Sequence, residues 1–165
     1  MKVLQSVALL IITLISMESS AQVETTLIFV RHAEKSTGND PELSQAGHER
    51  AQRLVETLRD LDIAAIYSTP FNRTRQTVAP ISKARNIAVT EYAASTPYGL
   101  FVSELLAKHK GKTVLVAGHS NTVPGMADAA FGKSSDIVIA EEDYGNIVIV
   151  KLREGADAKL ERSRY

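Results

Sequence analysis

The chain has 165 residues, which is enough for one domain with a full hydrophobic core and too few for two ordinary domains. Its 19 lysine and arginine residues equal its 19 aspartate and glutamate residues, so the protein as a whole has no general attraction for nucleic acid or for an anionic membrane surface. It contains no cysteine, which excludes disulfides, thiolate metal sites and lipid-modified cysteine.

The N-terminal residues are typical of a secretory signal. Lys2 supplies a positive charge, Val3 to Ile15 is mostly apolar, and Ser19-Ser20-Ala21 supplies the small residues that a signal peptidase recognises. We expect cleavage after Ala21, which leaves residues 22–165 as a single exported domain, in a bacterial periplasm or secreted. A retained membrane anchor is the alternative, although the apolar run is shorter than the about 20 residues that span a bilayer.

The first strand is predicted at Leu27 to Val30. Four apolar residues in a row, bounded by polar and charged residues, are typical of a strand buried on both faces. Arg31 and His32 follow directly, and ligands of open α/β sheets bind beyond the carboxyl ends of the strands. We therefore expect these two side chains at the mouth of a cleft, with the turn-rich loop from Ser36 to Glu42 on its rim.

A helix is expected from Ser44, a good N-cap, to about Asp60. Its apolar residues recur every three or four positions, as in a helix that buries one face. They are Ala51, Leu54, Val55, Leu58 and Leu61. His48 lies in the first turns of this helix and is expected at the surface.

A second strand is predicted from Ile63 to Tyr67, and Ser68-Thr69-Pro70 after it favours a turn into another helix. Arg73 and Arg75 lie in the first turns of that helix. Because they are two residues apart they point to different sides, so only one of them reaches the cleft easily, and either assignment stays open here. Pro80 is expected to kink or restart the helix before Ala84.

A short third strand is predicted at Ile87 to Val89, followed by a loop of small residues to Pro97. The next helix is expected from about Tyr98 to His109, where His109 offsets the helix dipole. Four apolar residues of this helix are expected to face inward. They are Leu100, Phe101, Leu105 and Leu106.

The fourth strand, Thr113 to Ala117, ends in Gly118-His119-Ser120 and leads into a helix that runs to about Ala130. The glycine permits a tight turn, and the amides at the start of the helix can face an anion. Ile137 to Ala140 and Ile147 to Leu152 are expected to complete the sheet, with a polar tail after them.

Three strand ends thus bring basic side chains to one edge of the sheet: Arg31 with His32, one of Arg73 and Arg75, and His119. Fixed guanidinium and imidazole N–H groups stabilise the charge on a phosphoryl group without a metal ion. His32 would attack in line and form a phosphohistidine that water hydrolyses. It must be neutral to attack, and we expect neighbouring arginines to lower its pKa and a backbone carbonyl to fix its tautomer. His119 is better placed as a hydrogen-bond donor to the phosphate.

These motifs resemble those of the histidine phosphatase superfamily, the phosphoglycerate mutase-like group. They are Arg31-His32-Ala33-Glu34, Ser68-Thr69-Pro70 with Arg73 and Gln76-Thr77, and Gly118-His119-Ser120. The resemblance implies an α/β fold, a three-layer α/β/α sandwich with a mostly parallel central sheet. It also implies His32 as nucleophile, with Arg31, Arg73 and His119 as phosphate ligands, and it selects Arg73 over Arg75.

Ser120 and Asn121 follow His119 where the acid phosphatase and phytase branch has an aspartate, so the resemblance favours the mutase-like branch 1. That branch usually takes its proton donor from a glutamate after the third strand. Glu91 is the only acidic residue between Arg85 and Pro97, so it is the candidate general acid, with a solvated loop carboxylate as the alternative.

Glu34 and the acidic run Glu141 to Asp143 are the other acidic candidates. Glu34 could serve as the acid, or it could pair with Lys35 or an arginine. The acidic run Glu141 to Asp143 is interpreted as a solvated turn, with a place in the cleft as the alternative. The small phosphohistidine phosphatases of the superfamily lack the acid, because a phosphoramidate leaves easily, and this is the functional alternative for the chain.

We therefore expect a metal-independent phosphatase, without a cofactor, that hydrolyses a phosphomonoester or phosphoramidate. Its partner would be a small phosphorylated substrate or a phosphohistidine protein, with neither nucleic acid nor stable membrane association after signal cleavage. A phosphoglycerate mutase is the enzymatic alternative, which an export signal disfavours because phosphoglycerate is a cytosolic metabolite. The third hypothesis is a phosphate-binding or sensing module without turnover. Substrate choice is expected to reside in loops such as 36–42 and 93–98.

Overall fold

The computed structural model describes residues 23–165, in which strands and helices alternate over most of the chain. The elements are β1 (Glu24–Arg31), α1 (Gln45–Thr57), β2 (Ile63–Ser68), α2 (Asn72–Arg85), β3 (Val89–Glu91), α3 (Tyr98–Lys108), β4 (Thr113–Gly118), α4 (Val123–Phe131), β5 (Asn146–Arg153) and β6 (Lys159–Arg164). The expected signal sequence, residues 1–21, lies outside the described residues.

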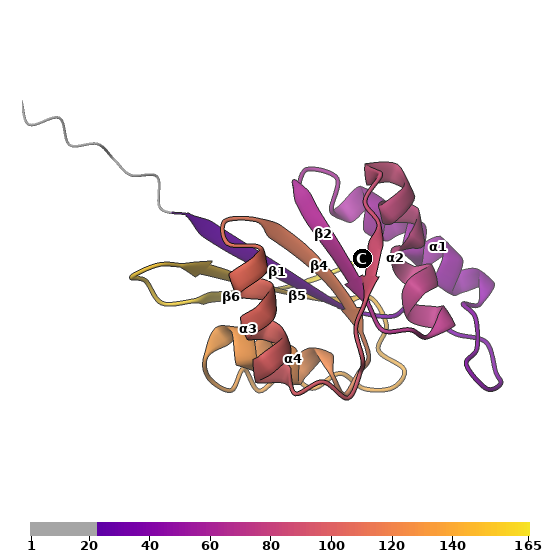
Figure 1. Cartoon of the computed structure of the whole chain (residues 1–165). Helices are drawn as coiled ribbons and strands as arrows, with labels where there is room; N and C mark the ends of the chain where they lie inside the picture. Colours follow the sequence, from indigo (N-terminus) through magenta and orange to yellow (C-terminus); the bar gives the residue numbers. More distant parts are fainter. Residues whose placement is uncertain (1–22) are drawn as a thin grey trace, which may run out of the picture.

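The strands form one six-stranded sheet in the order β3-β2-β4-β1-β5-β6. β1 pairs in parallel with β4, and β2 pairs in parallel with both β4 and β3. β5 is antiparallel to β1 and to β6. The arrows of β1, β2 and β4 therefore run to the same edge of the sheet, which brings together the residues that follow them (Figure 1).

Helices cover both faces of the sheet: α1 and α2 lie on one face, and α3 and α4 on the other (Figure 1). β1 shows why, because successive side chains of a strand point to opposite faces. Leu27 and Phe29 pack into the core beneath α3 and α4, whereas Ile28 and Val30 pack into the core beneath α1 and α2. The predicted three-layer α/β/α fold with a mostly parallel sheet, and the burial of its first strand on both faces, are confirmed.

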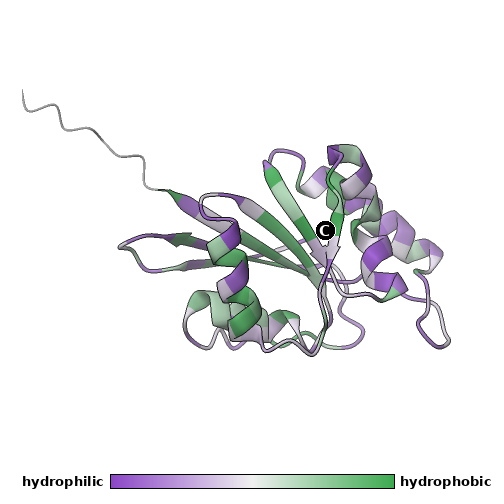
Figure 2. Ribbon diagram, in the orientation of Figure 1, coloured by the Kyte–Doolittle hydropathy of each residue, from purple (hydrophilic) through white to green (hydrophobic). Residues whose placement is uncertain are grey.

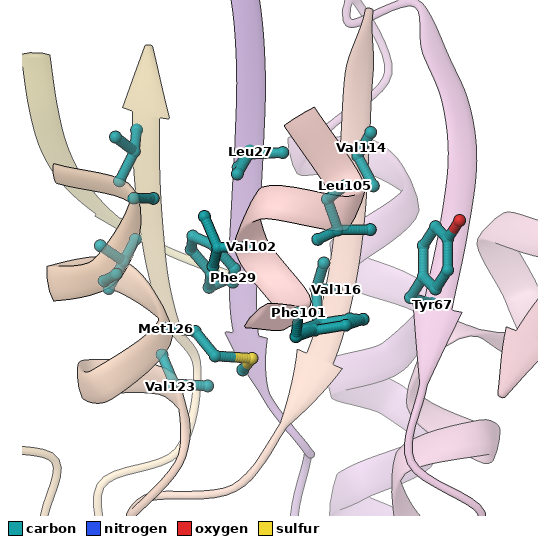
Figure 3. Packing of buried hydrophobic residues seen from close by; sticks show 14 of the residues in the cluster. Leu27, Phe29, Tyr67, Phe101, Val102, Leu105, Val114, Val116, Val123 and Met126 are labelled. Carbon is teal, nitrogen blue, oxygen red and sulfur yellow. The ribbon is translucent and has the colours of Figure 1, made fainter. Parts of the chain in front are cut away.

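The first of these cores is seen from close by in Figure 3, where Phe29 and Leu27 of β1 face Val102 and Phe101 of α3. Burying an apolar side chain of this size contributes about 1.5–3 kcal/mol to stability. Figure 2 shows the same division by hydropathy: the central strands are largely hydrophobic, and the helices carry hydrophilic residues on their outer sides. The sheet is therefore a fixed platform for the loops at its carboxyl edge.

The predicted start of α1, with Ser44 as its N-cap, is confirmed. The hydroxyl oxygen of Ser44 accepts a hydrogen bond from the Gly47 amide at 3.2 Å. The restart expected at Pro80 is wrong. α2 continues through Pro80 to Arg85, since Val78 and Ile81 on either side of the proline are completely buried and hold the helix against the sheet. This packing offsets the hydrogen bond that proline cannot make.

The third strand lies later than predicted, at Val89–Glu91. Asn86 ends α2 in the left-handed conformation with φ 53°, and the Ile87 amide then donates to the Ser82 carbonyl at 3.0 Å. Ile87 therefore closes the helix instead of starting the strand, and Glu91 becomes the last residue of β3.

Two further expectations about apolar residues are corrected. Leu100 is 53% exposed, and Val102 takes the inward place in α3 beside Phe101 and Leu105. Ile137 to Ala140 is not a strand: Ile137 and Ile139 are buried, but the backbone carbonyl of Ala140 accepts a hydrogen bond from Arg31 instead of joining the sheet.

The polar tail contains a strand, β6, that the sequence does not reveal. Its side chains are mostly exposed because it is an edge strand that pairs only with β5. Charged residues are typical of such an edge, and Lys151 and Glu161 form a cross-strand ion pair at 2.8 Å. Within residues 23–165, no helix has the length and apolar character needed to cross a bilayer.

Candidate active site

A cavity of about 430 Å³ opens at the carboxyl edge of the sheet, where β1, β2 and β4 end. Its walls come from segments far apart in the sequence. They include His32, Lys35, Arg73, His119, Ser120 and Glu141. The rings of His32 and His119 face each other edge to face, with centroids 5.5 Å apart. The structure thus brings together both predicted histidines and one predicted arginine.

His32 has the tautomer that a nucleophile needs. Its Nδ1 lies 2.8 Å from the carbonyl oxygen of Ala33. A carbonyl oxygen only accepts, so we assign the proton to Nδ1, which leaves the lone pair on Nε2. Burial lowers the pKa of His32 to about 4, and the charges of Arg31 and Arg73 act in the same direction. The ring is therefore neutral near pH 7, as predicted, but burial contributes more than the arginines do.

His119 is held by residues from two elements. Its amide donates to the Thr122 hydroxyl at 2.9 Å, and its Nε2 lies 3.0 Å from the Thr69 hydroxyl at the end of β2. Nδ1 has no hydrogen-bond partner within residues 23–165. Burial, with Arg73 and Arg31, lowers the pKa of His119 to about 4. A bound phosphate would raise this pKa and favour the protonated, donating form.

Gly118 is needed for a close approach of chain segments at the end of β4. A Cβ atom at this position would lie 2.8 Å from Oγ1 of Thr122 and 3.2 Å from the hydroxyl oxygen of Tyr92. Any larger residue would therefore displace the Thr122 hydroxyl that holds the His119 amide.

Arg73 is the arginine that reaches the cavity. Its side chain is 17% exposed, lies over the Phe71 ring at 4.6 Å, and has Nη1 at 3.6 Å from the Asp40 carboxylate. Arg75 points elsewhere and forms an exposed ion pair with Glu91 at 3.0 Å. The structure makes the same choice between the two arginines as the motif resemblance does.

Arg31 lies behind the cavity wall. Its side chain is completely buried, and its Nη1 and Nη2 donate to the carbonyls of Ala140 and Glu141 at 2.6 and 2.7 Å. Within the described residues, Nε of Arg31 and Nε of Arg73 are buried and have no hydrogen-bond partner. A buried donor without a partner costs about 1–3 kcal/mol, more when it is charged. This spare donor capacity is expected where an anion binds.

The remaining motif residues hold this arrangement in place. The Thr77 hydroxyl accepts from the Ala33 amide at 2.9 Å, and the Gln76 side chain accepts from the Leu43 amide at 2.7 Å. Both bonds attach the segment after β1 to α2. They therefore set the position of His32 relative to Arg73.

Comparisons with known proteins bear on the family and the fold of this chain. A sequence model of the histidine phosphatase superfamily (branch 1) matches residues 27–94, from β1 to the segment after β3. Over this part of its length, the chain is similar to the histidine phosphatase superfamily. Phosphoserine phosphatase 1 of Hydrogenobacter thermophilus is 32% identical over 97 residues, which cover 50% of this chain and 46% of that protein. The chain spans less than half the length of the curated relatives it matches.

Solved structures share the fold of this chain. The mycobacterial glucosyl-3-phosphoglycerate phosphatase Rv2419c has a TM-score of 0.69 and 13% identity, over 86% of this chain and 98% of that one. The protein histidine phosphatase SixA in complex with tungstate has a TM-score of 0.67 and 17% identity, over 84% of this chain and 96% of that one. The fold expected from the motifs is thus confirmed.

Glu91, the predicted general acid, is not among the residues that line the cavity of His32. It is half-exposed at the end of β3, pairs with Arg75, and lines a separate cavity beside α3. From the segment after β3, the residue that lines the His32 cavity is Ala94.

Glu34 does not face the cavity either; it forms a salt bridge with Arg50, with distances of 2.6 to 2.9 Å. Burial raises the pKa of the Glu34 carboxyl, but the hydrogen bonds and charge of Arg50, together with a bond from the backbone amide and the charge of Arg53, hold the pKa below its usual value. Arg50 also donates to the Tyr165 carbonyl, and the buried Tyr165 hydroxyl donates to the Arg31 carbonyl at 2.6 Å. Glu34 and Tyr165 therefore support the backbone next to His32.

For Glu141 a solvated turn was the first interpretation and a place in the cleft the alternative, and the structure places it on the cavity wall. Its Oε1 accepts a hydrogen bond from the Ser120 hydroxyl at 2.6 Å, and its Oε2 lies 3.3 Å from Nη2 of Arg31. The bond from Ser120, with the charge of Arg31, lowers the pKa of Glu141. Sequence reasoning gave the cleft position of Glu141 only as an alternative, and it missed the roles of Thr69 and Tyr165, whose contacts with His119 and Arg31 have no local sequence signal.

Proposed function

We propose that this protein is a metal-independent phosphatase that works through a phosphohistidine on His32. The observation that carries the proposal is the pairing of Nδ1 of His32 with the Ala33 carbonyl, inside a cavity that Arg73 and His119 also line. This pairing leaves a neutral imidazole with a free lone pair on Nε2, next to donors suited to a phosphoryl group.

In the first step, Nε2 of His32 attacks phosphorus and the bond from phosphorus to the leaving group breaks, with its electron pair going to the leaving atom. Arg73 and His119 donate to the phosphoryl oxygens as their charge develops. In the second step, water attacks the phosphohistidine, the P–N bond breaks, and inorganic phosphate and neutral His32 are restored. The proton that the leaving group gains in the first step is balanced by the proton that water loses in the second.

A phosphoramidate suits this cavity better than an alkyl phosphomonoester. An alkoxide leaving group needs a proton from a nearby acid, whereas a nitrogen leaving group can carry its own proton. Glu91 does not line the cavity, and Glu141 has a lowered pKa and is ionised near neutral pH. The SixA structure that shares this fold is named a protein histidine phosphatase, which supports a phosphoramidate substrate here.

The test is phosphate release in the presence of EDTA by the purified protein, on p-nitrophenyl phosphate and on phosphohistidine. We expect His32→Ala to lower both rates by about a thousandfold or more. The matched control is His48→Ala, because His48 is exposed on α1 and does not line the cavity. Retention of activity in His32→Ala, or failure to trap a radiolabelled phosphoenzyme with the wild type, would contradict the proposal.

A phosphate-binding module without turnover is the second candidate, favoured by Ala94 standing where the segment after β3 meets the cavity. It predicts saturable binding of phosphate without a phosphoenzyme. Phosphoglycerate mutase activity stays a prediction that the same assay tests, by transfer of the phosphoryl group instead of its release.

We also propose export, which rests on the signal-like sequence of residues 1–21. A periplasmic or secreted fraction from cells that express the full chain should contain a protein whose first residue is Gln22. Recovery of the chain with Met1 intact from the cytoplasm would contradict this.

A further inference from the structure

We infer that Glu141 selects the substrate's leaving group, favouring one that carries a cationic nitrogen with N–H donors and disfavouring an anionic one. This inference rests on the proposed phosphatase function and concerns the same cavity. It identifies the substrate class as phosphoryl compounds of a guanidinium, imidazolium or ammonium group.

The cavity has opposite charges on its walls. Arg73 and His119 supply donors for the phosphoryl oxygens, whereas the Glu141 carboxylate is only an acceptor and would repel those oxygens. The part of a substrate that Glu141 can contact favourably is therefore the part that is not phosphate. Because His32 occupies the position of the nucleophile, that part is the leaving group.

The Glu141 carboxylate is available to a ligand. Its side chain is 72% exposed at the cavity, and the described ion pairs include none between Glu141 and Lys35, which lines the same cavity. The Ser120 hydroxyl occupies one acceptor position of Oε1 and orients the carboxylate. The two oxygens of an ionised carboxylate have about four acceptor positions, so capacity remains for N–H donors.

A purely structural role does not account for this carboxylate. Arg31 is already held by the backbone carbonyls of Ala140 and Glu141 at 2.6 and 2.7 Å, and its contact with the Glu141 carboxylate is longer, at 3.3 Å. Any side chain at position 141 would leave the carbonyl contacts in place. The negative charge at this place on an otherwise basic wall is thus left for a ligand.

The experiment measures kcat/KM of the wild type and of Glu141→Gln on four substrates: phosphohistidine, phosphoarginine, p-nitrophenyl phosphate and 3-phosphoglycerate. Glutamine keeps the shape and loses the charge. We expect Glu141→Gln to lower kcat/KM for the two cationic leaving groups about tenfold, mainly through KM, since a hydrogen bond to a charged group is stronger than one to a neutral group and exposure weakens it. The rate on p-nitrophenyl phosphate should change less than about twofold, and that on 3-phosphoglycerate should rise.

Two further variants sharpen the test. Glu142→Gln removes the same charge from the adjacent exposed residue that does not line the cavity, and should leave all four values unchanged. Ser120→Ala keeps the charge but frees the carboxylate, and should weaken the discrimination only in part. Phospholysine, with its phosphoryl group on the side-chain nitrogen, in place of phosphoarginine tells whether an ammonium group is recognised as well as a guanidinium.

An equal change on all four substrates, or no change on any of them, would overturn the inference while leaving the proposed function intact. If the wild type releases phosphate from no substrate, the proposed function fails instead. The inference is then judged by calorimetric titration of His32→Ala with phosphoarginine and with 3-phosphoglycerate. Tighter binding of phosphoarginine, abolished when Glu141→Gln is added to this variant, supports the inference. Equal binding of the two compounds rejects it.

Discussion

The floor and the mouth of the cavity are built differently. The floor consists of His32, which is 3% exposed, with the completely buried Arg31 behind it, and backbone carbonyls hold both side chains. The mouth consists of exposed side chains such as Lys35 and Glu141, with few partners. A buried, hydrogen-bonded floor keeps the reacting groups in one geometry, whereas an exposed mouth can vary without disturbing the fold. In the proposed function, the floor carries the chemistry and the mouth the choice of substrate.

The largest effect after loss of His32 is expected at Arg73, which reaches the floor from α2. Arg73→Ala removes a charged donor from the phosphoryl site and should lower kcat/KM about a hundredfold or more, as for other transition-state donors. Arg75→Ala is the matched control, since Arg75 lies two residues away in an exposed pair with Glu91. Steady-state kinetics on p-nitrophenyl phosphate measures both, and equal losses in the two variants would refute the assignment.

The buried histidines make stability depend on pH. Burial lowers the pKa of His32 to about 4, while in the unfolded chain it stays near 6.5. As pH falls from 6.5 toward 4, the unfolded state takes up a proton that the folded state does not, so folding stability decreases over this range. Between pH 7 and pH 5 the loss from His32 should be on the order of 2 kcal/mol.

Urea denaturation of the wild type and of His32→Ala at these two pH values measures this loss. The variant should lose less stability than the wild type between pH 7 and pH 5. His119, whose pKa is also lowered to about 4, keeps a similar dependence in both proteins. The same decrease in both would mean that His32 does not titrate as its burial implies.

A smaller effect is expected at Tyr165, which supports the floor from below. Tyr165→Phe leaves the ring in place but removes the donor to the Arg31 carbonyl, and should lower the free energy of unfolding by about 1–2 kcal/mol. If Tyr165 also positions His32, kcat should fall a few-fold with KM unchanged. Loss of stability alone, with kcat intact, would assign it a structural role only.

The smallest effect is expected at Glu91. Because it does not line the cavity and pairs with Arg75, Glu91→Gln should change kcat on p-nitrophenyl phosphate less than about twofold. Because Glu91 belongs to neither the floor nor the mouth of the cavity, this variant also tests the division between them. A loss of about a hundredfold would restore Glu91 as the general acid and would show that the segment after β3 moves toward His32 when substrate binds.

Much of the site follows from local sequence. His32 and His119 each follow directly after a strand with an apolar core pattern, Arg73 lies in the first turn of the helix after β2, and parallel strands present their carboxyl ends at one edge. The identity of the acidic residue at the cavity does not follow in this way. Glu91 and Glu141 are both carboxylates near a strand or a turn, and only the path of the chain decides which one reaches the wall.

The sequence by itself determined the alternation of strands and helices, the burial of β1 on both faces and the basic residues at the strand ends, because these depend on local apolar patterns and turn residues. Tertiary structure decided the extension of α2 through Pro80, the later start of β3, the edge strand β6 and the contact of Tyr165 with Arg31, which are 134 positions apart. Such contacts depend on how distant segments pack together, and no local pattern encodes them.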